Sequence, residues 1–282
     1  MVRVIIAAII AAAAIFKVAD AATLAQRYTR LSCAIVYLHT DKEGGTGFFI
    51  DAAGHVATAA HVALDRSISG SPQKYTATLK DGLMLHLPSG NDYPMPPQIL
   101  TEKQVALSHR DIVILSTGIP SSCFIPVLSH ARLPIGEHVI AIGYPATAHS
   151  GLAPEITLFD GFISSRYSGT HAVANIIDRP GYSTTENFDV LRLQMPVTPG
   201  ASGSPVIDDN GSAVAIVIET PVPELGDINA LIQGEIFRKP AGTALIMGMN
   251  LNKILAEYIF LSQTYVSSGS GLAVPLSYLS KR

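Results

Sequence analysis

Three short segments carry side chains that can cooperate in nucleophilic catalysis, although they lie far apart in the chain. Ser202 lies in the glycine-rich segment Gly200–Pro205, His61 follows a short run of small residues, and Asp111 opens the apolar run Asp111–Leu115. A serine hydroxyl is a weak nucleophile unless a neighbouring base takes its proton. Histidine supplies such a base near neutral pH, and a buried carboxylate holds its imidazole in the required tautomer. These residue types predict acyl transfer with Ser202 as nucleophile, His61 as base and Asp111 as the residue that orients the base.

The residues around Ser202 also predict a binding site for a developing oxyanion. Glycine lets the chain turn sharply, which brings backbone N–H groups together. We expect the N–H groups of Gly200 and Ser202 to form this oxyanion hole. Ser204 is the nearest rival nucleophile. Asp65 and Asp81 are weaker candidates for the carboxylate, because neither leads into a comparable strand-like run.

Each of these residues also has a non-catalytic interpretation. Ser202 taken alone is an ordinary loop serine, and Asp111 can be a residue that caps the start of a strand. His55 lies close to His61 in the chain, which suggests a metal pair. A third ligand is not evident, however, and His55 fits better as a turn residue. We therefore expect no metal and no other cofactor.

The chain order His, Asp, Ser and the sequence around each residue resemble the chymotrypsin-like serine proteases, especially bacterial trypsin-like and HtrA-type enzymes. The resemblance covers about 33–217, with a weaker similarity at 271–275. It implies an all-β fold of two six-stranded antiparallel β-barrels, with His61 and Asp111 in the first barrel and Ser202 in the second. It also implies a serine endopeptidase that works through an acyl-enzyme intermediate.

Two positions near Ser202 depart from this family. Ala201 stands where members usually have Asp or Asn, and Ser204 stands where they usually have Gly. Zymogen-activated relatives need an aspartate at the position of Ala201. Its absence implies an active site that forms without propeptide cleavage. The altered loop keeps a catalytically inactive protease-fold binding protein open as an alternative. An esterase of the α/β-hydrolase type is disfavoured, because those enzymes place Ser before Asp and His.

The substrate pocket is predicted from three further residues. Pro196 stands six positions before Ser202, where a trypsin-type enzyme has an acid that holds Lys or Arg. The expected strand at 215–219 would line the pocket and pair with the substrate backbone. Its Ile216 and Ile218 predict a small or medium apolar P1 residue.

The composition predicts a folded, mostly β protein. The chain has 282 residues, of which 48% are apolar and 15% charged, and its formal charge of −3 gives no basic surplus for nucleic acid. Short Val, Ile and Leu runs alternate with scattered Gly and Pro, which favours barrels or sandwiches. We expect an N-terminal barrel over 22–130 and a C-terminal barrel over 131–282. We also expect an insertion at about 221–269 that contains an amphipathic helix at 251–261.

The first 21 residues have the pattern of a secretory signal peptide. Arg3 precedes the uncharged apolar run Val4–Phe16, and Ala19-Asp20-Ala21 offers a cleavage site after Ala21. The run is short for a bilayer span. An uncleaved anchor is the alternative, which Lys17 favours. We expect a secreted or periplasmic protein with no membrane attachment after cleavage.

The two cysteines and the C-terminus bear on the assembly. Cys33 and Cys123 either form a disulfide in an oxidising compartment or remain two separate buried thiols, and their spacing does not separate these options. The chain ends soon after 273–275, which leaves no room for the PDZ domain that HtrA-type enzymes usually carry. We therefore expect a monomer that acts on protein or peptide substrates.

Overall fold

The computed structural model of the protein describes residues 23–69, 74–129, 133–145, 155–168, 188–219, 245–246, 249–250 and 269–279. The expected signal peptide at 1–21, the helix at 251–261 and most of the insertion at 221–269 lie outside the described residues.

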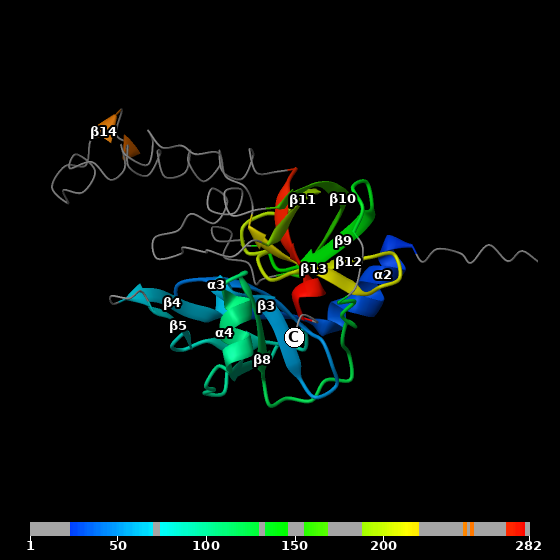
Figure 1. The fold of residues 1–282 in the computed structure, drawn as a ribbon. Coiled ribbons are helices and arrows are strands. Elements are labelled where there is room, and N and C mark those ends of the chain that lie inside the picture. Colours follow the sequence, from blue (N-terminus) through cyan, green and yellow to red (C-terminus); the bar gives the residue numbers. More distant parts are fainter. Residues whose placement is uncertain are drawn as a thin grey trace, which may run out of the picture.

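The first half of the chain forms a six-stranded antiparallel sheet in the order β7-β6-β1-β2-β3-β8. Its strands are β1 (Ile35–His39), β2 (Gly44–Phe49), β3 (His55–Ala59), β6 (Met84–His86), β7 (Asp92–Pro94) and β8 (Ile112–Ser116). A separate antiparallel hairpin consists of β4 (Leu64–Ser69) and β5 (Lys74–Leu79). This half of the molecule is drawn in blue to green in the lower part of Figure 1.

The second half forms a closed barrel in the order β10-β11-β16-β13-β12-β9. Its strands are β9 (His138–Gly143), β10 (Thr157–Ser168), β11 (Asp189–Gln194), β12 (Pro205–Ile207), β13 (Ala213–Glu219) and β16 (Gly271–Pro275). A two-stranded sheet pairs β14 (Leu245–Ile246) with β15 (Met249–Asn250). The expected chymotrypsin-like fold class is confirmed, with the first barrel present as a half-barrel sheet and the second as a closed barrel.

The helices are short, and some of them were not predicted from the sequence. They are α2 (Leu24–Leu31), α3 (Ala60–Ala63) and α4 (Glu102–Ser108), with 3-10 turns η1 (Ser32–Ala34) and η2 (Leu276–Leu279). α4 begins at a capping box between Thr101 and Gln104, in which each residue's side chain bonds the other's backbone N–H. That Thr-x-x-Gln pattern was the signal for a helix between strands. β4 was missed as well, because its alternating polar residues leave little apolar run to recognise.

The two halves share one hydrophobic core. A large cluster of buried side chains includes Ile35 and Ile112 from the first sheet together with Ile140 and Ile216 from the second barrel. A smaller cluster fills the barrel interior and includes Val217. Since successive side chains of a strand point to opposite faces, β13 contributes alternately to the shared core and to the barrel.

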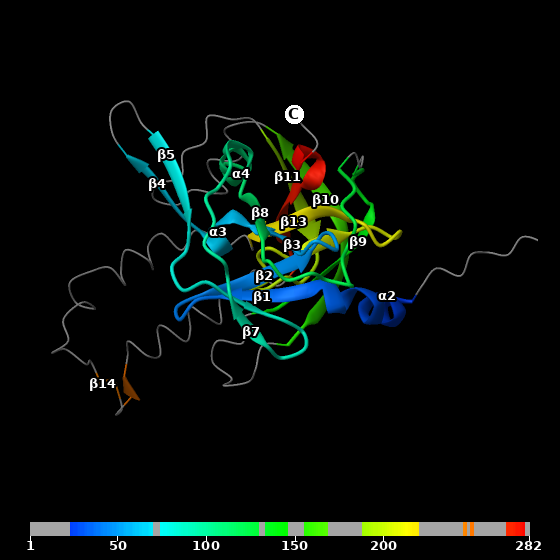
Figure 2. The same ribbon diagram turned by 90° about the horizontal axis from the view of Figure 1, so that it is seen from below.

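Helix α2 precedes β1 in the chain but packs against the second half (Figures 1 and 2). Its buried Arg27 donates hydrogen bonds to the Asp209 carboxylate, at 2.9 Å, and to the Asp208 carbonyl, at 2.6 Å. The Tyr28 hydroxyl donates to the Ile156 carbonyl at 3.1 Å. The segment before the first strand therefore joins the two halves.

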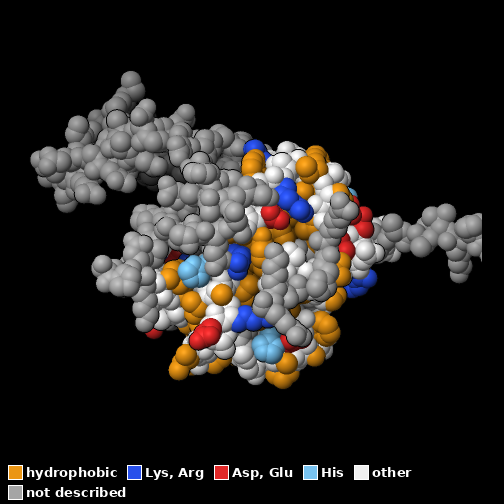
Figure 3. All heavy atoms as spheres, in the orientation of Figure 1, with side chains coloured by type: hydrophobic (Ala, Val, Ile, Leu, Met, Phe, Trp, Pro, Cys, Tyr) orange, Lys and Arg blue, Asp and Glu red, His pale blue; other side chains and the backbone are white. Residues whose placement is uncertain are grey.

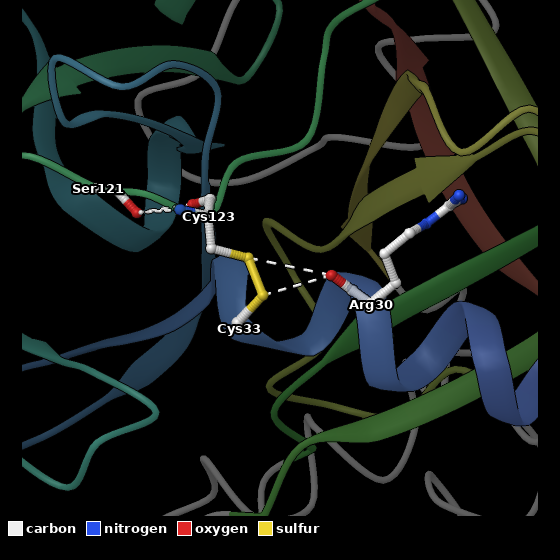
Figure 4. The surroundings of a disulfide bond; sticks show 4 residues. All are labelled: Arg30, Cys33, Ser121 and Cys123. Atoms are coloured by element: carbon white, nitrogen blue, oxygen red, sulfur yellow. Dashed lines mark hydrogen bonds between the residues drawn. A yellow bond between two sulfur atoms is a disulfide. The ribbon is translucent and has the colours of Figure 1, made fainter.

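Cys33 and Cys123 form a disulfide, with their Cα atoms 5.9 Å apart (Figure 4). This resolves the two options that the sequence left open. Cys33 lies in η1 rather than in the first strand, which begins at Ile35. The bond ties the start of the first sheet to the segment that follows β8.

The face shown in Figure 3 carries charged, histidine and apolar side chains interspersed with one another. In the part of the chain that the structure describes, no helix is long and apolar enough to cross a bilayer.

Candidate active site

His61 and Asp111 meet because their strands are antiparallel neighbours. His61 lies in α3 immediately after β3, and Asp111 immediately precedes β8. Ala59 at the end of β3 is paired with Ile112 at the start of β8, so the two ends lie side by side. His61 Nδ1 lies 2.6 Å from Asp111 Oδ2, and the His61 backbone N–H donates to Asp111 Oδ1 at 2.9 Å. The sheet thus brings together two residues that are 50 positions apart.

Asp111 adopts an uncommon backbone conformation and is almost fully buried. Its φ of 59° is the one positive φ among the described residues other than glycine, and the residue is 2% exposed. Aspartate tolerates this left-handed region better than most residues. The Ala60 N–H donates to the Asp111 carbonyl at 2.9 Å, and Arg66 Nη1 donates to Asp111 Oδ1 at 2.9 Å. The side chain and N–H of His61, the Arg66 guanidinium and the Ala60 N–H therefore all bond to this residue.

The surroundings of Asp111 favour its ionised form. Burial by itself would raise the pKa of this carboxyl group, but the charge and hydrogen bonds of His61 and the Arg66 guanidinium outweigh burial and lower the pKa. An ionised carboxylate can only accept hydrogen bonds, so it selects the tautomer with the proton on His61 Nδ1. His61 Nε2 is then left unprotonated and able to act as a base.

The loop that carries Ser202 is fixed against the first sheet by Thr46 of β2. The Thr46 N–H donates to the Ser202 carbonyl at 2.8 Å, and Thr46 Oγ1 donates to the Gly200 carbonyl at 3.1 Å. Gly203, with φ of 91°, lies so near the Thr46 carbonyl that a Cβ atom would collide with it. Only glycine combines this φ with so close an approach.

The backbone N–H groups of the loop differ in their partners. The N–H of Ala201 donates to the Thr198 carbonyl at 3.1 Å, that of Gly203 to the Val217 carbonyl at 2.7 Å, and that of Ser204 to the Ala201 carbonyl at 2.9 Å. Within the described residues, the N–H groups of Gly200 and Ser202 donate no hydrogen bond. These two N–H groups are the pair that the sequence analysis assigned to an oxyanion hole.

The Ser202 hydroxyl donates to the Ile218 carbonyl at 3.2 Å. No hydrogen bond joins it to His61 in the described part of the chain. The serine loop nevertheless adjoins the segment of His61, because a Cβ atom at Gly45 would contact both the Ser202 carbonyl and the side chain of Val62. The structure thus joins two of the three predicted residues directly and places the third on the facing loop.

Ser204, the rival nucleophile, is fully buried. Its hydroxyl lies against Gly143 of β9, where a Cβ atom would collide with it. A substrate cannot approach a hydroxyl in this position, so Ser202 is the better candidate.

The predicted pocket residues do not line one pocket in the described structure. Ile216 and Ile218 are 0% and 1% exposed, and their side chains belong to the core shared by the two halves. Pro196 is exposed. The backbone carbonyl of Ile218, rather than its side chain, is the group that reaches Ser202.

Three residues that the sequence analysis did not identify support the site. Arg66 contacts Asp111, Thr46 holds the serine loop, and the buried Lys80 donates to the His61 carbonyl at 2.7 Å and to the Glu43 carboxylate. Only Thr46 had a local signal, the flanking glycines of Gly45-Thr46-Gly47.

His55 has a structural partner of its own. It begins β3, and its Nδ1 lies 2.7 Å from Oδ2 of Asp51 in the preceding turn. His55 is therefore the first residue of a strand, bonded to the turn before it, rather than a residue of the turn itself as predicted.

A half-barrel sheet and a closed barrel, with the histidine and aspartate on the first and the serine loop on the second, form the architecture of chymotrypsin-like serine proteases. The family model described as a trypsin-like peptidase domain matches residues 45–216, more than half of the chain. The chain therefore belongs to this family of serine protease hydrolases.

Similar proteins agree with this assignment. A protein named probable periplasmic serine endoprotease DegP-like, from Bartonella henselae (strain ATCC 49882 / DSM 28221 / CCUG 30454 / Houston 1), is 26% identical over 202 residues, which are 71% of this chain. The chain spans 31% of the length of that relative.

Two solved structures are also similar. The first is Rv3671c from M. tuberculosis H37Rv, a serine-to-alanine mutant in an inactive form, with a TM-score of 0.53 and 16% identity over 90% of this chain and 86% of that one. A serine endoprotease from Yersinia pestis gives a TM-score of 0.46 and 17% identity over 71% and 58% of the two chains. The likeness to Rv3671c supports the fold.

Proposed function

We propose that this protein is an active serine endopeptidase, with Ser202 as nucleophile, His61 as general base and Asp111 as the residue that orients His61. The observation that carries the proposal is the 2.6 Å contact between His61 Nδ1 and the buried carboxylate of Asp111. A buried, ionised carboxylate is costly unless it has partners, and this one faces an imidazole at the end of a neighbouring strand.

The proposed reaction begins when the Ser202 hydroxyl turns from the Ile218 carbonyl toward His61 Nε2. Oγ then attacks the substrate carbonyl while His61 takes the proton, and the N–H groups of Gly200 and Ser202 donate to the oxyanion. His61 returns the proton to the leaving amine, which leaves an acyl-enzyme. Water, activated by the same histidine, hydrolyses the ester and regenerates Ser202.

The proposed substrates are proteins or peptides with a small or medium apolar P1 residue. Pro196 has no charge with which to bind a basic side chain. The side chains of Ile216 and Ile218 are buried in the shared core, and Ile216 is paired on both sides, with β12 and β16. The Ile218 carbonyl beside the Ser202 hydroxyl is therefore the part of β13 that we propose contacts substrate. Hydrolysis of a peptide library tests this preference, and cleavage mainly after Arg or Lys would contradict it.

The proposed location is outside the cytoplasm, with the protein secreted or periplasmic and acting as a monomer. The signal-like pattern at the N-terminus supports export, and the disulfide between Cys33 and Cys123 fits an oxidising compartment. The name of the Bartonella relative describes that protein as periplasmic. Fractionation of the source cells and light scattering of the purified protein test these two statements.

The second candidate function is that of an inactive protease-fold binding protein. The hydrogen bond from Ser202 Oγ to the Ile218 carbonyl favours it, because a hydroxyl held there is not activated by His61.

Labelling with a fluorophosphonate probe, which reacts with activated serines, decides between the two functions. We expect the wild type and S204A to be labelled, and S202A and H61Q to remain unlabelled. S204A is the matched control because it removes a buried hydroxyl two residues away. A folded wild type that is not labelled would overturn the protease proposal and favour the inactive binding protein.

A further inference from the structure

The hairpin of β4 and β5 places a cation beside the carboxylate of Asp111. Arg66 of β4 donates from Nη1 to Asp111 Oδ1 at 2.9 Å and to the Ser108 carbonyl at 3.4 Å. The side chains of Arg66 and Asp111 are only 10% and 3% exposed. An ion pair with so little solvent around it is weakly screened, unlike a surface salt bridge.

The two oxygens of Asp111 have different partners. Oδ2 faces His61 Nδ1, whereas Oδ1 accepts from both the His61 backbone N–H and Arg66. Charged and titratable groups near the pair lie on α3, on β4, on β5 and in the turn after β5, where Lys80 contacts the Glu43 carboxylate. His61 lies on α3, Arg66 on β4 and Tyr75 on β5. Lys80 follows β5 and also contacts the His61 carbonyl. Of these, Arg66 is the cation that bonds the carboxylate in the described structure.

The same hairpin also holds the turn that precedes β8. The Tyr75 hydroxyl lies 2.9 Å from Ser108 Oγ, and the Asp111 N–H donates to the Ser108 carbonyl at 3.1 Å. Arg66 Nη1 thus contacts both ends of this turn, its Ser108 carbonyl and its Asp111 carboxylate. Its position helps to maintain the left-handed conformation of Asp111, which is uncommon for a residue other than glycine.

A cation beside Asp111 makes the electrostatic potential at the His61 imidazole less negative. The Asp111 carboxylate stabilises the protonated imidazolium, and a positive charge on the other side of the carboxylate opposes that effect. We propose that Arg66 is a positioning residue that opposes the stabilisation of the His61 imidazolium by sharing the charge of Asp111. The catalytic role of Arg66 rests on the proposed function. The electrostatic coupling between Arg66 and His61 can be measured whether or not the protein is an active enzyme.

The test replaces Arg66 in the full chain and follows His61 by two methods. R66Q and R66M remove the charge, and R66M keeps the packing of the aliphatic stem. R66K restores the charge. R192Q is the matched control, because Arg192 is an exposed residue of β11 in the other half of the molecule. The methods are the NMR titration of the His61 imidazole, assigned by its absence in H61Q, and the pH dependence of fluorophosphonate labelling.

We expect the titration midpoint of His61 and the acidic limb of labelling to move to higher pH in R66Q and R66M, by about 0.5–1 unit. This is less than the 1–3 units typical of a directly adjacent charge, because Arg66 acts through Asp111. On the acidic side, such a shift lowers the labelling rate about three- to tenfold. R66K and R192Q should titrate like the wild type.

The outcomes separate the two proposals. Unshifted midpoints in folded R66Q and R66M would overturn the role of Arg66, as would loss of folding in both, which would make the ion pair purely structural. A shifted NMR midpoint in a protein whose wild type is not labelled would support the coupling and overturn the proposed protease activity.

Discussion

Replacing Thr46 by valine should damage both the stability of the protein and the loop that carries Ser202. Thr46 is fully buried, and its hydroxyl bonds the two halves: it donates to the Gly200 carbonyl at 3.1 Å and accepts from the Tyr144 N–H at 2.8 Å. Valine has nearly the same shape as threonine, so the cost of T46V comes from the lost hydroxyl and its two hydrogen bonds.

The magnitude follows from the groups left behind. A buried N–H without a partner, here that of Tyr144, costs about 1–3 kcal/mol, and loss of the hydrogen bond to the Gly200 carbonyl costs about 1 kcal/mol more. We therefore expect T46V to lower the free energy of unfolding by about 3 kcal/mol and the Tm by roughly 6–12 °C. T46S is the matched control, because it keeps the hydroxyl and loses one methyl group, worth about 1 kcal/mol.

The catalytic effect should arise through Gly200, whose N–H is assigned to the oxyanion hole. With its carbonyl no longer held, the peptide groups of the loop can rotate. The full loss of one oxyanion donor costs about 10²–10³ in rate, which sets the upper limit for T46V. We expect fluorophosphonate labelling of T46V to be at least tenfold slower than that of T46S, within this limit.

Urea unfolding and labelling rates of the two variants measure both effects. A T46V protein as stable as T46S would show that water or backbone movement satisfies the two buried groups. Equal labelling rates would show that the Thr46 hydroxyl does not position the serine loop. Either result would refute the corresponding part of the argument.

Three further perturbations have defined outcomes. Because the pKa of Asp111 is lowered in the folded chain, its ionised form stabilises the fold above about pH 4, the ordinary aspartate value. This stabilisation is lost as the pH falls below that value. In D111N, the midpoint of urea unfolding should therefore change less between pH 2 and 6 than it does in the wild type. The disulfide spans 90 residues, so C33S/C123S should lose about 2–5 kcal/mol, and reduced wild type should unfold at the same urea concentration as this variant. G203A should abolish labelling, because the new Cβ atom would collide with the backbone of β2. G90A is its control, at a similar positive φ with open space around it, and should be labelled normally. Equal labelling of the two variants would contradict the close approach at Gly203.

Much of the fold was predictable because most strands carry their own apolar signal. The apolar run Asp111–Leu115 covers most of β8, and the expected strand at 215–219 lies within β13. Strands with polar residues, such as β4 and β7, were not predicted, since their pairing depends on neighbours rather than on local composition. α4 was missed although its capping box was present in the sequence.

The candidate site, like the fold, was predictable from the sequence only in part. The residue types and order of His61, Asp111 and Ser202 were evident, because each sits in a distinctive local motif. The pocket assignment was weaker: Ile216 and Ile218 were read as lining residues, but the face of β13 that they occupy is buried against the first sheet. The sheet that packs over a strand decides which of its faces can line a pocket. The residues of the strand alone do not predict this.

The sequence by itself determined the chemistry available to this protein: a serine in a glycine-rich turn, a histidine after a strand and an aspartate before another. Only the tertiary structure decided which cation, which carbonyl and which hydroxyl surround them. Arg66 contacts Asp111 across 45 residues, and Thr46 holds Gly200 across 154. Such contacts arise when antiparallel strands bring distant ends together, and they are set by packing between whole elements rather than by neighbouring residues in the chain.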